Sequence, residues 1–161
     1  MTRTFLAVVF AALTLAGCSK TPSKSEFANT ALVAGTFEIE SSKIAQTKSK
    51  RDDVKAFAAK MITDHTAAAE NLKKAAPEDG VQLGAPALDD DHADKLRQLQ
   101  EAKPEDFDAL YIKMQRKAHD DAVSLFSDYS KNGAAGALKT FAGATLPTLE
   151  QHQAHVKSLP L

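Results

Sequence analysis

Three histidines and one glutamate stand within stretches whose apolar residues recur at helical spacing. His65, His119 and His152 each fall on the apolar stripe of a different predicted helix, and Glu38 falls on a fourth stripe. Such polar side chains are costly in a protein interior unless they are paired, hydrogen-bonded or bound to a metal. Imidazole nitrogens and carboxylate oxygens suit Zn, Cu, Fe or Ni. The four residues therefore predict a buried transition-metal site.

The spacing of the surrounding apolar residues is what directs these four side chains inward. His65 and His152 lie within runs at steps of three and four residues, His119 belongs to a broad apolar face, and Glu38 lies on a shorter stripe of small residues. The apolar residues on the same stripe are, in chain order, Phe27, Ala31, Ala34 and Ala45 for Glu38; Val54, Ala58, Met61, Ala68 and Leu72 for His65; Ile112, Ala122, Phe126 and Tyr129 for His119; and Leu138, Ala142, Leu149 and Val156 for His152.

The levels of these residues along their helices decide which of them can meet. Counted from the link between the first two helices, Glu38 is 11 residues away and His65 is 16, an axial difference of roughly 7 Å. His119 is 14 residues from the turn at Gly133, near the middle of its helix. His152 is 19 residues from the same turn and matches this level less well. We expect Glu38, His65 and His119 to converge, and the place of His152 stays open.

Two further residues are predicted to hold the ligating side chains in place by hydrogen bonds. Asp64 precedes His65, and Tyr111 lies on the helix of His119, so both are candidates for hydrogen bonds to ligating side chains. An alternative interpretation is a hydrogen-bonded polar cluster that fixes helix register and binds no metal. Both interpretations are carried forward.

The elements that must position these residues are helices, because no stretch shows the apolar and polar alternation of a strand. Proline, glycine and acidic first-turn residues mark the helix ends, and Pro77 is predicted to end the second helix. The predicted helices span about residues 26–47, 52–76, 89–102, 105–131 and 134–159.

Two short links and one long connection define the expected fold class. The short links predict two antiparallel hairpins, whereas some 28 residues join the second long helix to the third. This is the layout of an all-α, ferritin-like four-helix bundle with a long crossover that carries a short helix. An up-and-down bundle with a decorated loop is the alternative.

The N-terminus carries the features of an export signal. Residues 1–17 combine Arg3 with a short apolar stretch, too short to span a bilayer. Residues 15–18, Leu-Ala-Gly-Cys, resemble the box at the end of a bacterial lipoprotein signal. Cys18 is then the lipidated residue, residues 18–25 form a flexible tether, and residues 26–161 form the bundle domain. Serine after the cysteine favours the outer membrane, facing the periplasm.

Composition and missing motifs exclude several classes of function. The 161 residues carry 20 Lys and Arg against 21 Asp and Glu, a formal charge of −1, which argues against a nucleic-acid partner. No glycine-rich phosphate loop or nucleophile elbow is present. No Glu-x-x-His occurs, so a di-iron oxidoreductase is disfavoured. We assign no catalytic residue, and a protein without enzymatic activity is favoured.

An ordered set of short motifs resembles a known family. The motifs are residues 35–45 (GTFEIESSKIA), 54–58 (VKAFA) and 61–65 (MITDH), followed by Phe107-Asp108, Tyr111, His119, Leu125-Phe126, Phe141-Ala142, Leu146-Pro147 and His152. In order and spacing they are similar to a bacterial exported family catalogued as domain of unknown function 4142. The resemblance implies a ferritin-like fold at the cell envelope and a metal site at Glu38, His65, His119 and His152, but no established activity. Ala118 departs from the acidic residue expected there.

These observations lead to two hypotheses about function. The first is an envelope lipoprotein that binds a transition-metal ion through the Glu and His cluster, in envelope stress or metal handling. The alternative is a non-catalytic structural or interaction protein of the periplasm. In both, the expected partners are the membrane, through the lipid on Cys18, and an envelope protein.

Overall fold

The computed structural model describes residues 21–161 of the chain. These residues form five helices and no strand, which confirms the predicted all-helical class for this part of the chain. The predicted signal and Cys18 lie outside the described residues. The helices are α1 (Lys24–Lys48), α2 (Asp52–Glu78), α3 (Asp90–Glu101), α4 (Pro104–Asn132) and α5 (Ala137–Ser158).

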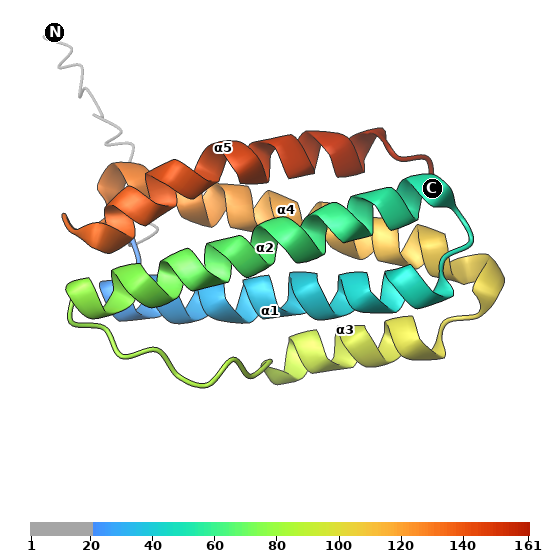
Figure 1. Ribbon diagram of the computed structural model, residues 1–161, viewed down its shortest axis with the longest axis horizontal. Coiled ribbons are helices and arrows are strands. Elements are labelled where there is room, and N and C mark those ends of the chain that lie inside the picture. The colour runs from blue at the N-terminus through green and yellow to red at the C-terminus, as the bar shows by residue number, and fades with distance from the viewer. Residues whose placement is uncertain (1–20) are drawn as a thin grey trace, which may run out of the picture.

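The four long helices lie side by side, and α3 packs along α1 (Figure 1). Helix α1 contacts α2 and α4, and α5 contacts α4 and α2. The connection through α3 returns along the length of the molecule, so α2 and α4 run in the same direction. An up-and-down order would instead pair α2 with α4 as antiparallel neighbours.

Local chemistry explains where the helix ends differ from the predicted ones. Helix α1 begins two residues early because Ser23 and Glu26 form a capping box, in which each side chain accepts a hydrogen bond from the other's backbone amide. The helix therefore includes the last two residues of the expected tether. Pro77 was predicted to end α2, but it lies in the last turn and the helix ends at Glu78. Helix α5 begins at Ala137, three residues later than predicted.

The interior consists of two apolar clusters with a polar layer between them. One cluster includes Phe27, Leu72, Phe126 and Phe141, and the other includes Phe57, Met61, Tyr111 and Val156. Along each long helix, the buried polar residues fall between these clusters. They are Glu38, Ser41, Ser42, His65, Gln115, His119 and His152. The polar layer therefore lies near the middle of the helices, held from both sides by packed apolar side chains.

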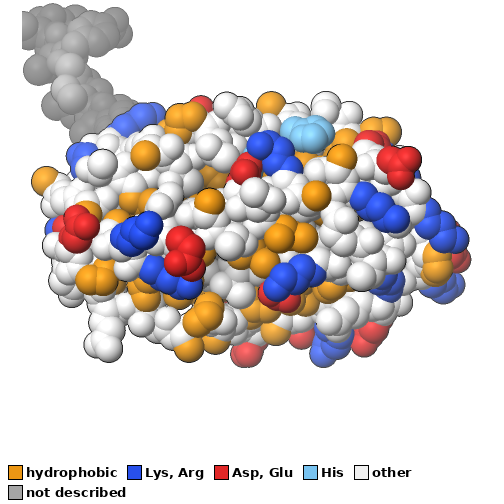
Figure 2. All heavy atoms as spheres, in the orientation of Figure 1, with side chains coloured by type: hydrophobic (Ala, Val, Ile, Leu, Met, Phe, Trp, Pro, Cys, Tyr) orange, Lys and Arg blue, Asp and Glu red, His pale blue; other side chains and the backbone are white. Residues whose placement is uncertain are grey.

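The surface seen in Figure 2 mixes acidic and basic side chains rather than gathering one sign of charge. None of the described helices is both long and apolar enough to cross a membrane.

The start of α5 depends on a close approach that only glycine permits. Gly136 has φ +151°, and a Cβ there would lie 1.9 Å from Asp79 Oδ1. Asp79 accepts hydrogen bonds from Lys24 Nζ at 2.7 Å and from the Leu138 amide at 2.8 Å, so it cannot withdraw without cost. We predict that Gly136→Ala lowers the free energy of unfolding by about 1–3 kcal/mol, measured by urea denaturation.

The matched control is Gly35→Ala, because an added Cβ at Gly35 meets no atom within 4 Å. Alanine is favoured over glycine inside a helix by about 1 kcal/mol, so this variant should be as stable as the wild type or more stable. Equal stability of the two alanine variants would contradict the close approach described for Gly136.

Candidate metal centre

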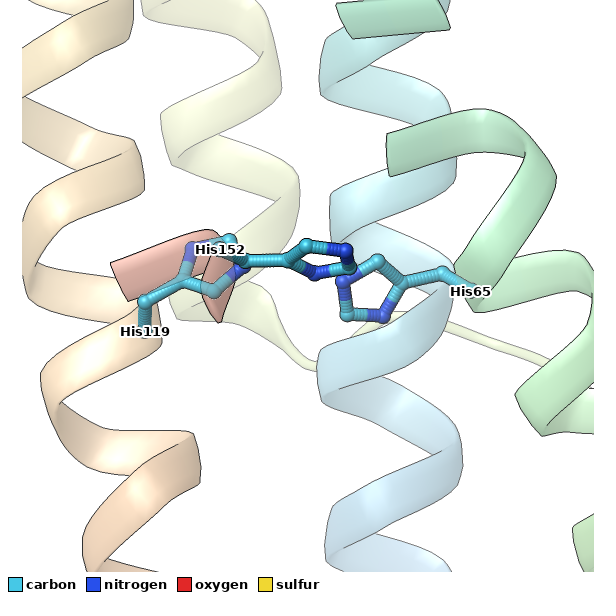
Figure 3. A group of neighbouring side chains, drawn as sticks. All are labelled: His65, His119 and His152. Carbon is cyan, nitrogen blue, oxygen red and sulfur yellow. The ribbon is translucent and has the colours of Figure 1, made fainter. Parts of the chain in front are cut away.

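Three imidazole rings from three helices converge in the polar layer (Figure 3). His65 comes from α2, His119 from α4 and His152 from α5. Their ring centroids are separated by 5.4–5.7 Å, and their exposed fractions are 7%, 0% and 1%. One nitrogen from each ring lies within 4.8 Å of the other two. Among residues 21–161, this is the group of side chains that can hold a metal ion.

The late start of α5 explains why His152 joins this group. The predicted turn placed His152 several residues beyond the level of His119. In the structure, His119 lies 13 residues before the end of α4 at Asn132, and His152 lies 15 residues after the start of α5 at Ala137. Residues 133–136, between the two helices, are not helical and so do not carry His152 further along the bundle. The two histidines therefore stand at nearly the same level.

Hydrogen bonds to neighbouring groups fix which nitrogen carries the proton in two of the three rings. His119 Nδ1 lies 2.9 Å from the Gln115 carbonyl, which can only accept, so Nδ1 carries the proton and donates. His152 Nε2 donates in the same way to Asp64 Oδ2 at 2.7 Å. The remaining atoms, His119 Nε2 and His152 Nδ1, are buried without a partner, as is His65 Nε2. When one nitrogen of a neutral imidazole donates its proton to another group, the other nitrogen is unprotonated and can bind a metal.

The environment favours the neutral form of His65 and of His152. Burial lowers the pKa of His65 to about 3, and the charges that His119 and His152 would carry lower it further. Burial also lowers the pKa of His152 to about 4, although its hydrogen bond to Asp64 opposes the shift. Near neutral pH, His65 and His152 are therefore neutral, and the hydrogen bond from His152 Nε2 to Asp64 leaves Nδ1 of that ring unprotonated.

Asp64 is held as a carboxylate behind His152. Burial alone would raise the pKa of Asp64, but hydrogen bonds from Lys60 and His152 outweigh it and keep the pKa below its usual value. Lys60 Nζ lies 2.8 Å from the same oxygen that His152 contacts. The predicted outer role of Asp64 thus corresponds to a contact with His152 in the structure.

Glu38 lies beside the cluster but outside the group of three donors. Its Oε1 is 3.8 Å from His119 Nδ1, on the ring edge that also faces Gln115. Its Oε2 is buried without a partner. Burial raises the pKa of Glu38. A positive charge on His119 and the hydrogen bond from the Gln115 amide act in the opposite direction but are smaller effects. Glu38 therefore lies beside the His119 ring rather than among the three donor nitrogens.

Tyr111 is directed elsewhere. Its hydroxyl lies 2.8 Å from Ser42 Oγ, and burial raises its pKa, so it is neutral. Its ring packs against Phe57 at 6.3 Å, and Phe57 in turn packs against His119 at 6.1 Å. Tyr111 thus supports the layer through packing with Phe57.

Sequence reasoning missed Gln115. Its backbone carbonyl sets the proton position on His119, and its side-chain amide donates to Ser41 Oγ at 3.0 Å. The available signal was its position four residues before His119, which places both on the same helix face.

The three nitrogens are close to the spacing that a metal requires. Zn–N bonds of about 2.0–2.1 Å in tetrahedral geometry place the nitrogens about 3.3 Å apart. Closing a gap of at most 4.8 Å to that distance requires ring movements of about 1–2 Å, which small side-chain rotations supply.

A family model described as Domain of unknown function (DUF4142) matches residues 12–159. The chain belongs to the DUF4142 family. The matched region includes all three histidines of the cluster, so the centre lies within the DUF4142 domain itself. No curated protein and no solved structure matches the chain.

Proposed function

We propose that this DUF4142 protein binds one transition-metal ion through His65, His119 and His152. The observation that carries the proposal is the convergence of three buried imidazoles, each of which has a buried nitrogen without a hydrogen-bond partner. A buried polar atom without a partner costs about 1–3 kcal/mol. A bound ion would satisfy all three atoms together.

The same observation weighs against a cluster that merely fixes helix register. Such a cluster would be expected to satisfy its polar atoms internally. Here the hydrogen bonds of His119 and His152 run outward, to Gln115 and Asp64, and leave the inward nitrogens unpaired. That division between outward donors and inward lone pairs is typical of metal sites.

The donor set indicates the kind of ion. Three imidazoles suit Zn²⁺, Cu²⁺ and other late first-row metals, and leave at least one coordination position for another ligand. Neutral imidazoles do not offset the charge of a divalent cation. The carboxylates of Asp64 and Glu38, each next to one ligating ring, provide that compensation from nearby.

Equilibrium dialysis of the purified chain with Zn²⁺, Co²⁺, Ni²⁺ or Cu²⁺, followed by elemental analysis, tests the proposal. We expect one ion per chain, and loss of that ion in His65→Ala, His119→Ala and His152→Ala. His155→Ala is the matched control, because His155 is exposed and lies on the same helix as His152. All variants carry Cys18→Ser, so that the thiol cannot bind the ion. Equal binding by wild type and His119→Ala would contradict the proposal.

Asp64→Asn should weaken the site without removing it. The amide keeps the size of Asp64 but no longer accepts the His152 proton as a charged group, so His152 becomes a poorer and less fixed ligand. We expect the dissociation constant to rise about 10- to 100-fold, measured by competition with a chromophoric chelator. Glu70→Gln, which alters an exposed carboxylate on the same helix paired with Lys73, should leave the constant unchanged.

We also propose a cellular setting for this centre. The signal-like residues 1–17 and Cys18 support a lipoprotein anchored in the outer membrane and facing the periplasm. The hairpins α1–α2 and α4–α5 are joined by a long crossover through α3, and they pack with α1 on α4 and α2 on α5. This arrangement supports a ferritin-like four-helix bundle. The proposed role is metal handling at the envelope. Labelling the chain with radioactive palmitate in cells tests the lipid anchor, and Cys18→Ser should remove the label.

A further inference from the structure

The layer formed by the three histidines has two unlike sides. One side is closed by Phe57 and Met61, which are fully buried. The Phe57 ring packs against His119, and Met61 lies one helical turn before His65. The other side opens into a cavity of about 40 Å³ that reaches toward Leu72 and Phe126.

Small residues create this cavity. Gly35 on α1 lines it, and a Cβ added there would meet no atom within 4 Å. The cavity has room for a molecule of about one to three non-hydrogen atoms. The other small lining residues are Ala31, Ala34, Ala68, Ala69, Ala118 and Ala122.

Two lining residues present buried polar atoms without partners. They are Glu38, through Oε2, and His65, through Nε2. Glu38 is 3% exposed and stands one turn after Gly35 on the same face of α1. A cavity with apolar walls, one carboxylate and one metal-ligating nitrogen is therefore a built site for a small polar molecule.

We infer that the remaining coordination position of the ion faces this cavity and binds a neutral, proton-donating molecule of one to three heavy atoms, such as water, which donates a hydrogen bond to Glu38 Oε2. This inference rests on the proposed function, because it requires an ion on the three histidines. The carboxylate of Glu38 accepts a hydrogen bond from a neutral ligand but repels an anion, so Glu38 selects against anionic ligands of the same size.

Azide titration of the Cu²⁺-loaded chain, in the Cys18→Ser background, tests this assignment through the azide-to-copper charge-transfer absorption. We expect saturable binding in the wild type and binding roughly tenfold tighter in Glu38→Gln, because a neutral amide replaces the repelling carboxylate. Gly35→Leu should fill the cavity and weaken azide binding at least tenfold, while Gly143→Ala, which does not line this cavity and whose added Cβ makes only an ordinary contact, should bind as the wild type does. Ala122→Leu fills the cavity from α4 and should act like Gly35→Leu. Copper stoichiometry, measured for each variant, shows that the centre is intact.

Each other outcome counts against a defined part of the account. If copper binds at one ion per chain but azide produces no absorption in either wild type or Glu38→Gln, the open position is overturned and the metal site stands. If both leucine variants bind azide as the wild type does, the position does not face this cavity. An unchanged azide affinity in Glu38→Gln overturns the role of Glu38. If copper does not bind, the proposed function fails, and this inference fails with it.

Discussion

Zinc at one hundred times its dissociation constant should raise the free energy of unfolding of the wild-type chain by about 2.7 kcal/mol. The gain arises because the ion binds the folded chain, in which three helices hold His65, His119 and His152 together, and not the unfolded chain, in which they are far apart. Urea denaturation with zinc and with EDTA measures the difference. His119→Ala should show no such gain, since two remaining imidazoles cannot hold the ion at that concentration.

The controls separate the centre from surface binding. His155→Ala, altered at an exposed histidine, should retain the full zinc-dependent gain. The metal-free stability of His119→Ala should also be compared with that of the wild type, because the histidine fills space in the interior. A zinc-dependent gain of similar size in both wild type and His119→Ala would show that the ion binds elsewhere.

Acidification should begin to destabilise the metal-free chain at a pH well above the range in which most carboxylates titrate. Burial holds the pKa of His65 at about 3 in the folded chain, whereas the unfolded value is about 6.5. The unfolded chain therefore binds more protons, and stability present above pH 6.5 is lost as the pH falls toward the folded value. The contribution of His65 alone is a loss of about 2 kcal/mol between pH 7 and pH 5.

Other groups modify this profile in predictable directions. His152, with its pKa lowered to about 4, adds to the loss. Glu38 opposes it, because burial raises its pKa and the folded chain takes up a proton there as the pH falls. Urea denaturation at several pH values in EDTA measures the slope, and His65→Leu should reduce it by about 1 kcal/mol per pH unit on average between pH 7 and pH 5. An identical slope in His65→Leu would contradict a neutral, buried His65.

The sequence was sufficient to predict the helices and the inward direction of the histidines. Both follow from spacing: the stripe through Val54, Met61 and Leu72 can face the interior only if His65 does too. The direction of the chain in the crossover followed from the length of the connection between α2 and α4, because a short link would have forced a hairpin.

Which residues belong to the metal centre was harder to predict, because it depends on the position of each residue along the axis of the bundle. The position of His152 depends on where α5 begins, and that is set by the contact between Gly136 and Asp79, which are far apart in the sequence. Helix spacing cannot supply such a contact. It also could not distinguish Asp64, which reaches His152, from Tyr111, whose hydroxyl pairs with Ser42, because side-chain direction depends on the neighbouring helix.

X-ray absorption spectroscopy of the zinc-loaded chain tests the central claim most directly, since it counts the atoms bound to the ion. The account predicts three imidazole nitrogens at about 2.0–2.1 Å and one further light atom, and no ion with this set of ligands in His65→Ala. A spectrum with oxygen ligands and no more than one imidazole would contradict it, whatever the affinity measured for the ion.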